Sequence, residues 1–292
     1  LGGSPDELTL SQKNYGVYLQ DQYYLSDRFS ILPGYRYEKV RYNFEQSQVL
    51  TASEAAEFGR QVLSAAVNLS YEEHSNLYAS VSQSFRNPLV DEFFVSKYDF
   101  GFGPGGGLNT ELIPQKANNY EIGIRHSVNQ QFALNLCGYR MNIKDEIYLE
   151  PSTFTNTNYD KTVRQGVECG AQVKLNERVK LSAEYAFIDA YFNGGMYDKK
   201  RIPAVAVHTW RAGTEFTLTT GLALSVFSNY VGERYFISDQ TNVLPRMAAY
   251  MTIDAKLTFT KNNYSLFAGI NNIFGEEYHW YDDDRYQQQG HQ

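Results

Sequence analysis

The residues with the clearest potential for binding chemistry include a short basic run in an otherwise acidic chain. Lys199, Lys200 and Arg201 are consecutive, whereas the whole chain carries a formal net charge of −7. Three neighbouring cations attract anions well, so the run could bind an anionic chelate or the phosphates of lipopolysaccharide. A solvated loop with no ligand is the alternative interpretation. The acidic balance of the chain argues against nucleic acid as a partner.

Aromatic residues form a second set, because 24 Tyr, 18 Phe and 2 Trp make up 15% of the chain. Aromatic side chains bury a large area at low entropic cost and suit the recognition of flat or chelated ligands. Many could instead form the interfacial girdles that hold a protein in a membrane. The candidates for ligand contact lie in or beside expected loops: Tyr98, Phe100, Phe102, Tyr191, Phe192, Tyr197, Tyr235, Phe236, Tyr278, Trp280 and Tyr281.

Other polar sets predict no further site. Asp282, Asp283 and Asp284 invite a calcium interpretation, but a full site needs about 6–8 oxygens and EF-hand spacing is absent, so we expect a solvated loop. The glycine-rich residues 101–107 lack a following GK[ST], which favours a flexible loop over a phosphate-binding one. We expect no metal site, no cofactor and no catalytic residue.

The segments that would position these loops have a period of two and no helical period. Residues 179–187 and 251–259 alternate apolar and polar side chains, which gives a strand one apolar and one polar face. Many such segments are longer than the roughly 9–11 residues that a tilted strand needs to cross a membrane. About twelve strands are expected, at residues 13–26, 28–44, 61–71, 75–86, 117–128, 131–150, 161–175, 178–192, 205–218, 221–235, 249–260 and 263–273.

The connections between these segments alternate in length. Short turns are expected near residues 27, 72–74, 129–130, 176–177, 220 and 261–262, and long connections at 45–60, 87–116, 151–160, 193–204 and 236–248. Tight turns at one rim and long loops at the other are typical of a transmembrane, antiparallel, up-and-down β-barrel. A soluble β-sandwich is the alternative, and it would mix loop lengths at both ends.

In a barrel of this kind, the apolar faces contact lipid and the polar faces line the lumen. Cys137 and Cys169 then lie on opposite faces, and a disulfide between them is excluded. The inward residues are expected to keep the wall polar or to form salt-bridge ladders against a plug. They are Arg36, Glu38, Glu121, Arg125, Arg211 and Glu215.

The first expected strand leads into a short turn and the last one follows a short turn, so both ends of the chain are expected at the long-loop rim. Complete bacterial barrels usually begin and end at the short-turn rim, and lipid tolerates no open sheet edge. The last twelve residues, YDDDRYQQQGHQ, form a polar tail with no terminal aromatic strand. We therefore expect a fragment cut at both ends, with at least one further strand after residue 292.

Several segments, taken together and in order, resemble the barrel motifs of TonB-dependent outer-membrane receptors. Each motif is weak alone, but the order and spacing of the set are specific. Two positions depart from the family pattern, with Thr110 where proline is common and Gln115 where glutamate is common. The matching residues are 15–37 (YGVYLQDQYYLSDRFSILPGYRY), 85–92 (FRNPLVDE), 109–123 (NTELIPQKANNYEIG), 139–147 (YRMNIKDEI), 158–168 (NYDKTVRQGVE) and 271–278 (NNIFGEEY).

This resemblance implies a 22-stranded barrel of which the twelve strands are the tenth to the twenty-first, with the plug domain and TonB box outside the sequence. It implies a receptor in the outer membrane of a Gram-negative bacterium, without enzyme activity, for TonB-energised uptake of a scarce nutrient. A ferric siderophore is the first choice of cargo. Its partners would be this chelate, the TonB complex through the missing plug, and outer-membrane lipid and lipopolysaccharide.

Alternative functions remain open. Cobalamin or haem is the alternative cargo; haem receptors of the family tend to carry a histidine in the loop that corresponds to residues 87–116, which has none here. His279 is the best remaining haem ligand. A self-contained, 12-stranded outer-membrane pore or enzyme barrel is an alternative of a different class. It could recruit His208, but no nucleophile motif surrounds any serine.

Overall fold

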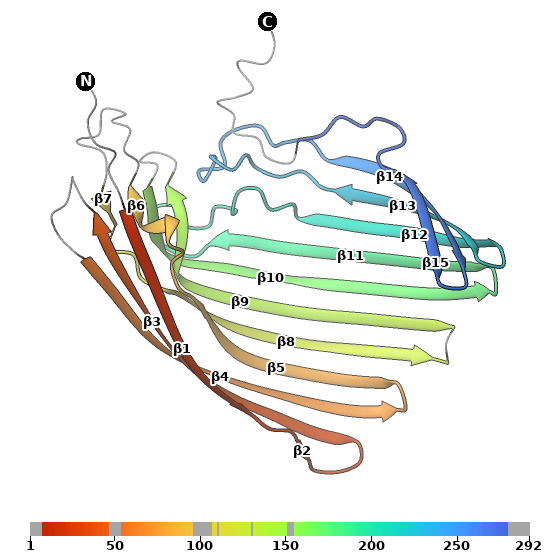
Figure 1. Ribbon diagram of the computed structural model, residues 1–292, viewed down its shortest axis with the longest axis horizontal. Helices are drawn as coiled ribbons and strands as arrows, with labels where there is room; N and C mark the ends of the chain where they lie inside the picture. The colour runs from red at the N-terminus through yellow and green to blue at the C-terminus, as the bar shows by residue number, and fades with distance from the viewer. Residues whose placement is uncertain are drawn as a thin grey trace, which may run out of the picture.

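Twelve long antiparallel strands form one sheet in which each strand pairs with the next along the chain (Figure 1). The computed structural model describes residues 8–46, 54–95, 107–109, 111–129, 131–150 and 155–279. No helix in these ranges is long and apolar enough to cross a membrane. The long strands are β1 (Leu8–Gln20), β3 (Phe29–Gln46), β4 (Glu54–Glu72), β5 (Ser75–Arg86), β8 (Gln115–Val128), β9 (Phe132–Glu150), β10 (Thr155–Asn176), β11 (Val179–Phe192), β12 (His208–Thr219), β13 (Leu222–Val231), β14 (Tyr250–Lys261) and β15 (Tyr264–Ile270).

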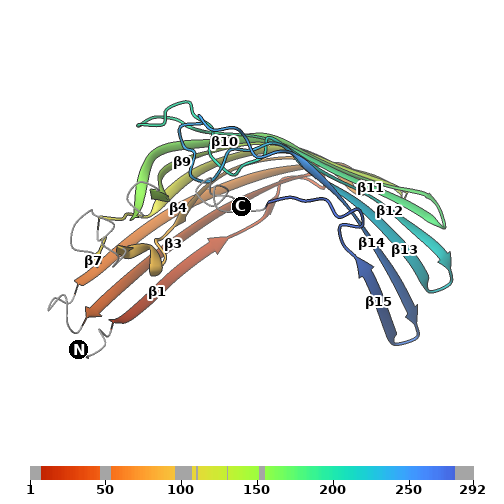
Figure 2. The ribbon, with the colours of Figure 1, turned by 90° about the horizontal axis from the view of Figure 1, so that it is seen from above.

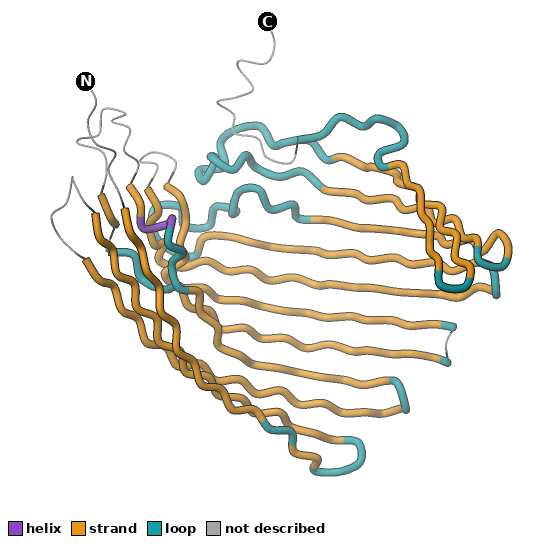
Figure 3. Tube along the Cα trace, in the orientation of Figure 1, coloured by secondary structure: helices purple, strands orange, loops and turns teal. Residues whose placement is uncertain are grey.

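The short elements lie at the ends of the long strands. β2 (Tyr23–Tyr24) pairs with the start of β3 and is the thirteenth strand of the sheet. The connection after β5 holds a single 3-10 turn, η1 (Asp91–Phe93), and a small hairpin of β6 (Phe94–Val95) and β7 (Gly107–Leu108). Figure 3 shows how strands dominate the described chain, with the longer loops gathered at one end.

The predicted fold class is confirmed, but two predicted loops are too long. Residues 54–60 belong to β4 and residues 155–160 to β10. The expected first strand is also wrong at its end, because β1 stops at Gln20. β3 and β4 pair without interruption from Phe29↔Leu69 to Phe44↔Glu54. Pairing continues there although the apolar alternation has ended, because a strand beyond the lipid needs no apolar face.

The sheet is strongly curved and open, like part of a barrel wall, and β1 and β15 are its two edge strands (Figure 2). Short turns join β4 to β5, β10 to β11, β12 to β13 and β14 to β15 at one end, and the longer connections lie at the other. This alternation matches the predicted arrangement of rims. Residues that face each other across paired strands share a side of the sheet, so within each regular stretch of pairing the register assigns strand residues to one of two faces. The alternation is interrupted at Asp145, whose φ is 56°.

The outward face carries a continuous apolar band. On β10 its members are Val167, Cys169, Ala171, Val173 and Leu175, which lie opposite apolar or small residues such as Leu134 and Leu136 of β9. Residues 167–175 of β10 span about 30 Å along the strand, which is about 23 Å of membrane depth at a tilt of about 40°. That depth fits the hydrocarbon layer of an outer membrane. Many of these side chains are exposed; Ile122 has 67% of its surface uncovered.

The opposite face, which we call the lumen face, is polar along most of its length but has an apolar cluster at the long-loop end. Val40, Tyr42 and Phe44 of β3 are buried there against Phe93 and Leu112 from the connection between β5 and β8. The ring centroids of Tyr42 and Phe93 are 5.1 Å apart. This cluster fixes that connection against the inside of the curve, at the mouth of the wall.

The two cysteines lie on opposite faces, as expected. Cys169 pairs with Leu136 on the outward face, whereas Cys137 pairs with Gly123 and Glu168 on the lumen face. Both thiols are free.

Candidate functional site

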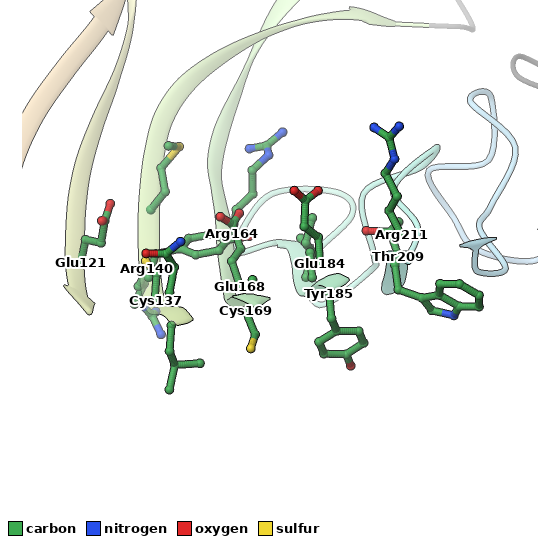
Figure 4. Close-up of a pocket in the computed structure, with 18 of the residues that line it drawn as sticks. Glu121, Cys137, Arg140, Arg164, Glu168, Cys169, Glu184, Tyr185, Thr209 and Arg211 are labelled. Carbon is green, nitrogen blue, oxygen red and sulfur yellow. The ribbon is translucent and has the colours of Figure 1, made fainter. Parts of the chain in front are cut away.

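The lumen face carries a cavity of about 1180 Å³ lined by strands β5 to β13. Charged side chains from successive strands point into it, and the register sets them side by side: Glu168 is on β10, and Glu184 of β11 lies directly opposite Arg211 of β12. Figure 4 shows Glu121, Arg164, Glu184 and Arg211 pointing to one side of the sheet and Tyr185 to the other. The wall can therefore contact a polar partner or a charged solute.

Two arginines on this face lie over aromatic rings, and each ring covers a glycine. The guanidinium carbon of Arg125 is 4.3 Å from the ring centroid of Tyr78, which lies opposite Gly123. Arg211 lies 4.5 Å from the ring centroid of Phe227, opposite Gly213 in the same way. The missing side chain makes room for the flat ring, and the cation covers its outer side.

This packing gives a testable effect on stability. A Cβ atom at residue 123 would lie 2.6 Å from the Tyr78 ring, whereas at residue 170 it would meet only a Glu184 side-chain carbon at 4.0 Å. We expect Gly123→Ala to lower the free energy of unfolding by about 1–2 kcal/mol, because the ring must move. Gly170→Ala, on the same face, is the control and should change it little. Urea unfolding of the full receptor in detergent measures both; equal midpoints would contradict this account.

The six predicted lumen residues share this face in the register. Arg36 forms an ion pair with Glu38, and Lys180 Nζ is 3.2 Å from a carboxylate oxygen of Glu215. Arg125 and Arg211 lie over aromatic rings instead of in ion pairs. Their role toward a plug or solute stays a prediction.

At the mouth, Arg86 and Glu92 hold the connection after β5 onto the wall. Arg86 Nη1 donates to both carboxylate oxygens of Glu92, at 2.7 and 2.8 Å. The same carboxylate accepts the backbone N–H of Leu89 at 2.7 Å. Arg86 Nε also donates to Gln115 at 3.3 Å. One side chain therefore ties the end of β5, the η1 turn and the start of β8 together.

Asparagine side chains complete this arrangement. The amide of Asn158 acts like a strand partner for Ile113: its oxygen accepts the Ile113 N–H at 3.0 Å and its nitrogen donates to the Ile113 carbonyl at 2.9 Å. Asn156 Nδ2 donates to the Glu92 carbonyl at 3.1 Å, and Asn109 Nδ2 donates to the Asn156 carbonyl at 2.6 Å. The sequence alone predicts no role for these asparagines. Their presence in the recurring motifs at 109–123 and 158–168 was the available signal.

A second aromatic cluster lies at the long-loop rim, where β9 and β11 end and β10 begins. Tyr159 packs edge-on against Phe192 and Tyr197, with ring centroids 5.2 and 5.8 Å away. The hydroxyls of Tyr159 and Tyr197 both donate toward Glu150 Oε2, at 3.2 and 3.5 Å. Burial and the Glu150 charge raise the pKa of the Tyr197 hydroxyl. We call Tyr148, Glu150, Tyr159, Phe192 and Tyr197 the rim cluster.

The basic run lies beside the rim cluster, and its members differ. Arg201 pairs with Asp189 at 3.0 Å, and its backbone N–H and carbonyl are both bound by the amide of Asn242. Lys199 and Lys200 are exposed, and no carboxylate among the described residues is within ion-pair distance of either. Arg201 is therefore a structural contact, and the two lysines remain open to an anion.

The other predicted contacts are partly packed against neighbours. Tyr191 meets Arg201 through an isolated backbone bridge. The Tyr235 hydroxyl accepts a hydrogen bond from Arg246 at 3.3 Å. Tyr278 stacks on Tyr250, with ring centroids 4.3 Å apart. In each case the contact is with a residue outside the rim cluster.

Several predicted residues lie outside the described residues. They are Tyr98, Phe100, Phe102, Trp280, Tyr281, the three aspartates 282–284 and most of the glycine-rich run. Within the ranges that are described, no group of three or more His, Cys, Asp or Glu side chains is arranged to hold a metal ion.

The family model "TonB dependent receptor-like, beta-barrel" matches residues 3–273. The chain belongs to this family. Its localisation in the outer membrane of a Gram-negative bacterium follows, since the family and its structural neighbours are outer-membrane proteins. Membership of the TonB-dependent receptor family accounts for the long strands, the apolar outward band and the polar lumen face of this chain.

Relatives that match the chain in sequence include proteins named as receptors. The chain is 23% identical over 285 residues to the metal-pseudopaline receptor CntO of Pseudomonas aeruginosa, covering 89% of this chain and 37% of that protein. It is 23% identical over 214 residues to the catecholate siderophore receptor Fiu of Escherichia coli, covering 70% of this chain and 28% of the relative. The chain therefore spans well under half the length of these proteins.

Solved structures agree on the fold. The ferric citrate transporter FecA in its unliganded form has a TM-score of 0.76 at 18% identity, covering 97% of this chain and 44% of that one. The copper transporter OprC also has a TM-score of 0.76, at 16% identity, over 92% of this chain and 43% of its own. At these identities the likeness establishes the barrel fold and leaves the cargo open.

Proposed function

We propose that this chain is part of the barrel wall of a receptor that takes up a ferric siderophore with energy from the TonB complex. The main support is that two open lysines, Lys199 and Lys200, lie beside the aromatic rim cluster at the long-loop end. Cations and aromatic rings together suit an anionic metal chelate with flat, ring-bearing ligands. Relatives named for chelated iron or other metals support the same class of cargo.

The wall would act together with a plug carried by a longer protein. The cavity on the lumen face offers carboxylates and guanidinium groups to such a domain, and these are suited to hydrogen bonds that form and break in water. The TonB complex would act on the plug rather than on this wall. We propose no bond-breaking step for these residues.

The cargo proposal predicts a measurable loss on removal of the two lysines. In the full receptor, we expect Lys199→Gln with Lys200→Gln to weaken the binding of an anionic ferric catecholate or carboxylate complex by about tenfold. The affinity should also depend less on salt, because screening acts on the charges that were removed. Fluorescence quenching on titration with each complex measures both effects.

The control keeps the charge, with arginine at both positions, and should bind nearly as well as the natural receptor. Cyanocobalamin and haem are titrated in parallel as the alternative cargoes. Tight binding of either, with no response to ferric chelates, would overturn the siderophore proposal. Haem binding that is lost in His279→Ala would identify the alternative directly.

A further inference from the structure

Three lysines face one another across three neighbouring strands on the outward face. Lys116 of β8 is directly opposite Lys144 of β9, and Lys144 is directly opposite Lys161 of β10. All three side chains are exposed. Adjacent strands are about 4.8 Å apart, so the row spans about 10 Å. We call these residues the lysine row.

Like charges directly opposite each other destabilise a sheet. Elsewhere on the same face a cation has an acid beside it: Lys39 Nζ is 2.6 Å from a Glu57 oxygen. Within the described parts of the chain, no carboxylate lies at ion-pair distance from any member of the lysine row. The repulsion within the row is therefore not relieved by any acid among the described residues.

A fourth cation lies one step nearer the apolar band. Arg140 is on β9, four residues before Lys144 on the same face, and polar neighbours orient its side chain. Its Nε donates to Asn142 Oδ1 at 3.0 Å and its Nη1 donates to Gln165 Oε1 at 2.8 Å. These partners are neutral, although Gln165 Nε2 also donates to the Asp189 carboxylate at 3.1 Å, and Asp189 pairs with Arg201. Among the described residues, no carboxylate is at ion-pair distance from Arg140 itself.

Directly beyond Arg140, toward the membrane, the outward face is hollowed. Gly138 lies between Ile122 and Val167 in the register, and a Cβ placed on it would meet nothing within 4 Å. A groove of about 530 Å³ is centred there, and its lining includes both neighbours and Phe187 together with Arg140 and Gln165. The groove therefore has apolar side chains at Ile122, Val167 and Phe187 and a cation, Arg140, at its long-loop end. Its lining also includes the polar residues Ser80, Tyr120, Glu121 and Tyr139.

We propose that this groove and the lysine row bind one phosphate-bearing glycolipid of the outer leaflet. An acyl chain lies in the groove over Gly138, and the headgroup phosphates lie on Arg140 and the lysine row. The lysine row lies toward the long-loop end of the strands, and long loops mark the outer rim of an outer-membrane barrel, so the row is on the side of the outer leaflet. The 10 Å row suits a headgroup with more than one phosphate, since a single phosphate cannot reach all four cations. A free anion would use the cations and leave the groove empty.

The test uses the full receptor, purified in detergent and titrated with diphosphorylated lipid A while native mass spectrometry counts bound lipid. Lys116→Gln with Lys144→Gln and Lys161→Gln is expected to weaken binding by about tenfold or more, because each basic residue next to an anionic surface contributes several-fold. Arginine at all three positions should restore it. Gly138→Phe, which fills the groove and changes no charge, should also reduce binding.

The matched control removes three positive charges at the opposite rim, with Lys174→Gln, Arg178→Gln and Lys261→Gln, and should bind as the natural receptor does. Migration of unheated samples on gels checks that each barrel is folded; if the triple variant fails this check, the single substitutions and Gly138→Phe decide. Equal lipid binding in the lysine-row and control variants would overturn the proposal. Displacement of lipid A by millimolar inorganic phosphate would do the same, because it would indicate a free-anion site.

Discussion

Ala171→Arg is expected to lower the free energy of unfolding of the receptor by about 2–4 kcal/mol, which is the cost of a cation at the middle of the bilayer. Ala171 is the central member of the outward apolar residues of β10 and lies opposite Leu134 of β9 and Ala183 of β11. An arginine there cannot reach water on the outer side without displacing lipid. Denaturant titration of the receptor reconstituted in phospholipid vesicles measures the change.

Gln172→Arg is the natural control, because it places the same side chain one residue along the same strand. Gln172 faces the lumen and lies opposite Ser182 of β11 and Ala133 of β9. We expect a change within about 0.5 kcal/mol at this polar surface position. Equal losses of unfolding free energy at the two positions would mean that the two faces contact the same solvent, and the assignment of the outward face to lipid would be wrong.

Glu92→Ala should release residues 87–95 from the wall and lower the free energy of unfolding by about 3 kcal/mol. This value is the lower end of the range for breaking a buried ion pair. The lower end applies because the Arg86 side chain is 36% exposed, whereas that of Glu92 is 17% exposed. The change removes the two carboxylate oxygens that accept from Arg86 Nη1, and it leaves the Leu89 N–H without its side-chain acceptor. Hydrogen exchange should become faster in residues 87–95 and unchanged in β14.

Glu92→Gln removes the negative charge of residue 92 but keeps the shape of its side chain. Its amide oxygen can still accept the Leu89 N–H, so we expect a smaller increase in exchange than with alanine. Glu57→Ala, which removes an exposed partner of Lys39 elsewhere on the wall, should leave residues 87–95 protected. Normal protection in Glu92→Ala would show that the apolar cluster around Phe93 holds the segment without the ion pair.

The wall of this molecule could be predicted from the sequence because the lipid imposes a strict pattern. An outward residue inside the bilayer must be apolar, so residues 179–187 and 251–259 show their faces without any knowledge of their neighbours. The prediction failed where that requirement ends. Residues 54–60 and 155–160 remain in strands through backbone pairing, which any side chain permits, and no periodicity marks them.

The candidate site was harder to predict, because its contacts join residues far apart in the chain. In the sequence, Lys199, Lys200 and Arg201 form one cationic run. In the structure, Asp189 and Asn242 bind Arg201, and the two lysines stay open. Asn158 reaches Ile113, 45 residues away. Such pairs follow from the register of the sheet, and a sequence without that register cannot supply them.

The continued pairing of β10 above the apolar band has a consequence for how such a receptor can change. The twelve residues 155–166 extend the wall by about 40 Å of strand, which is about 30 Å of height at a tilt of about 40°. This part of the wall continues the sheet above the apolar band, and hydrogen bonds between neighbouring strands hold it together. The loops at its end can therefore change in sequence, and so in ligand specificity, without any change in the apolar band that membrane insertion requires.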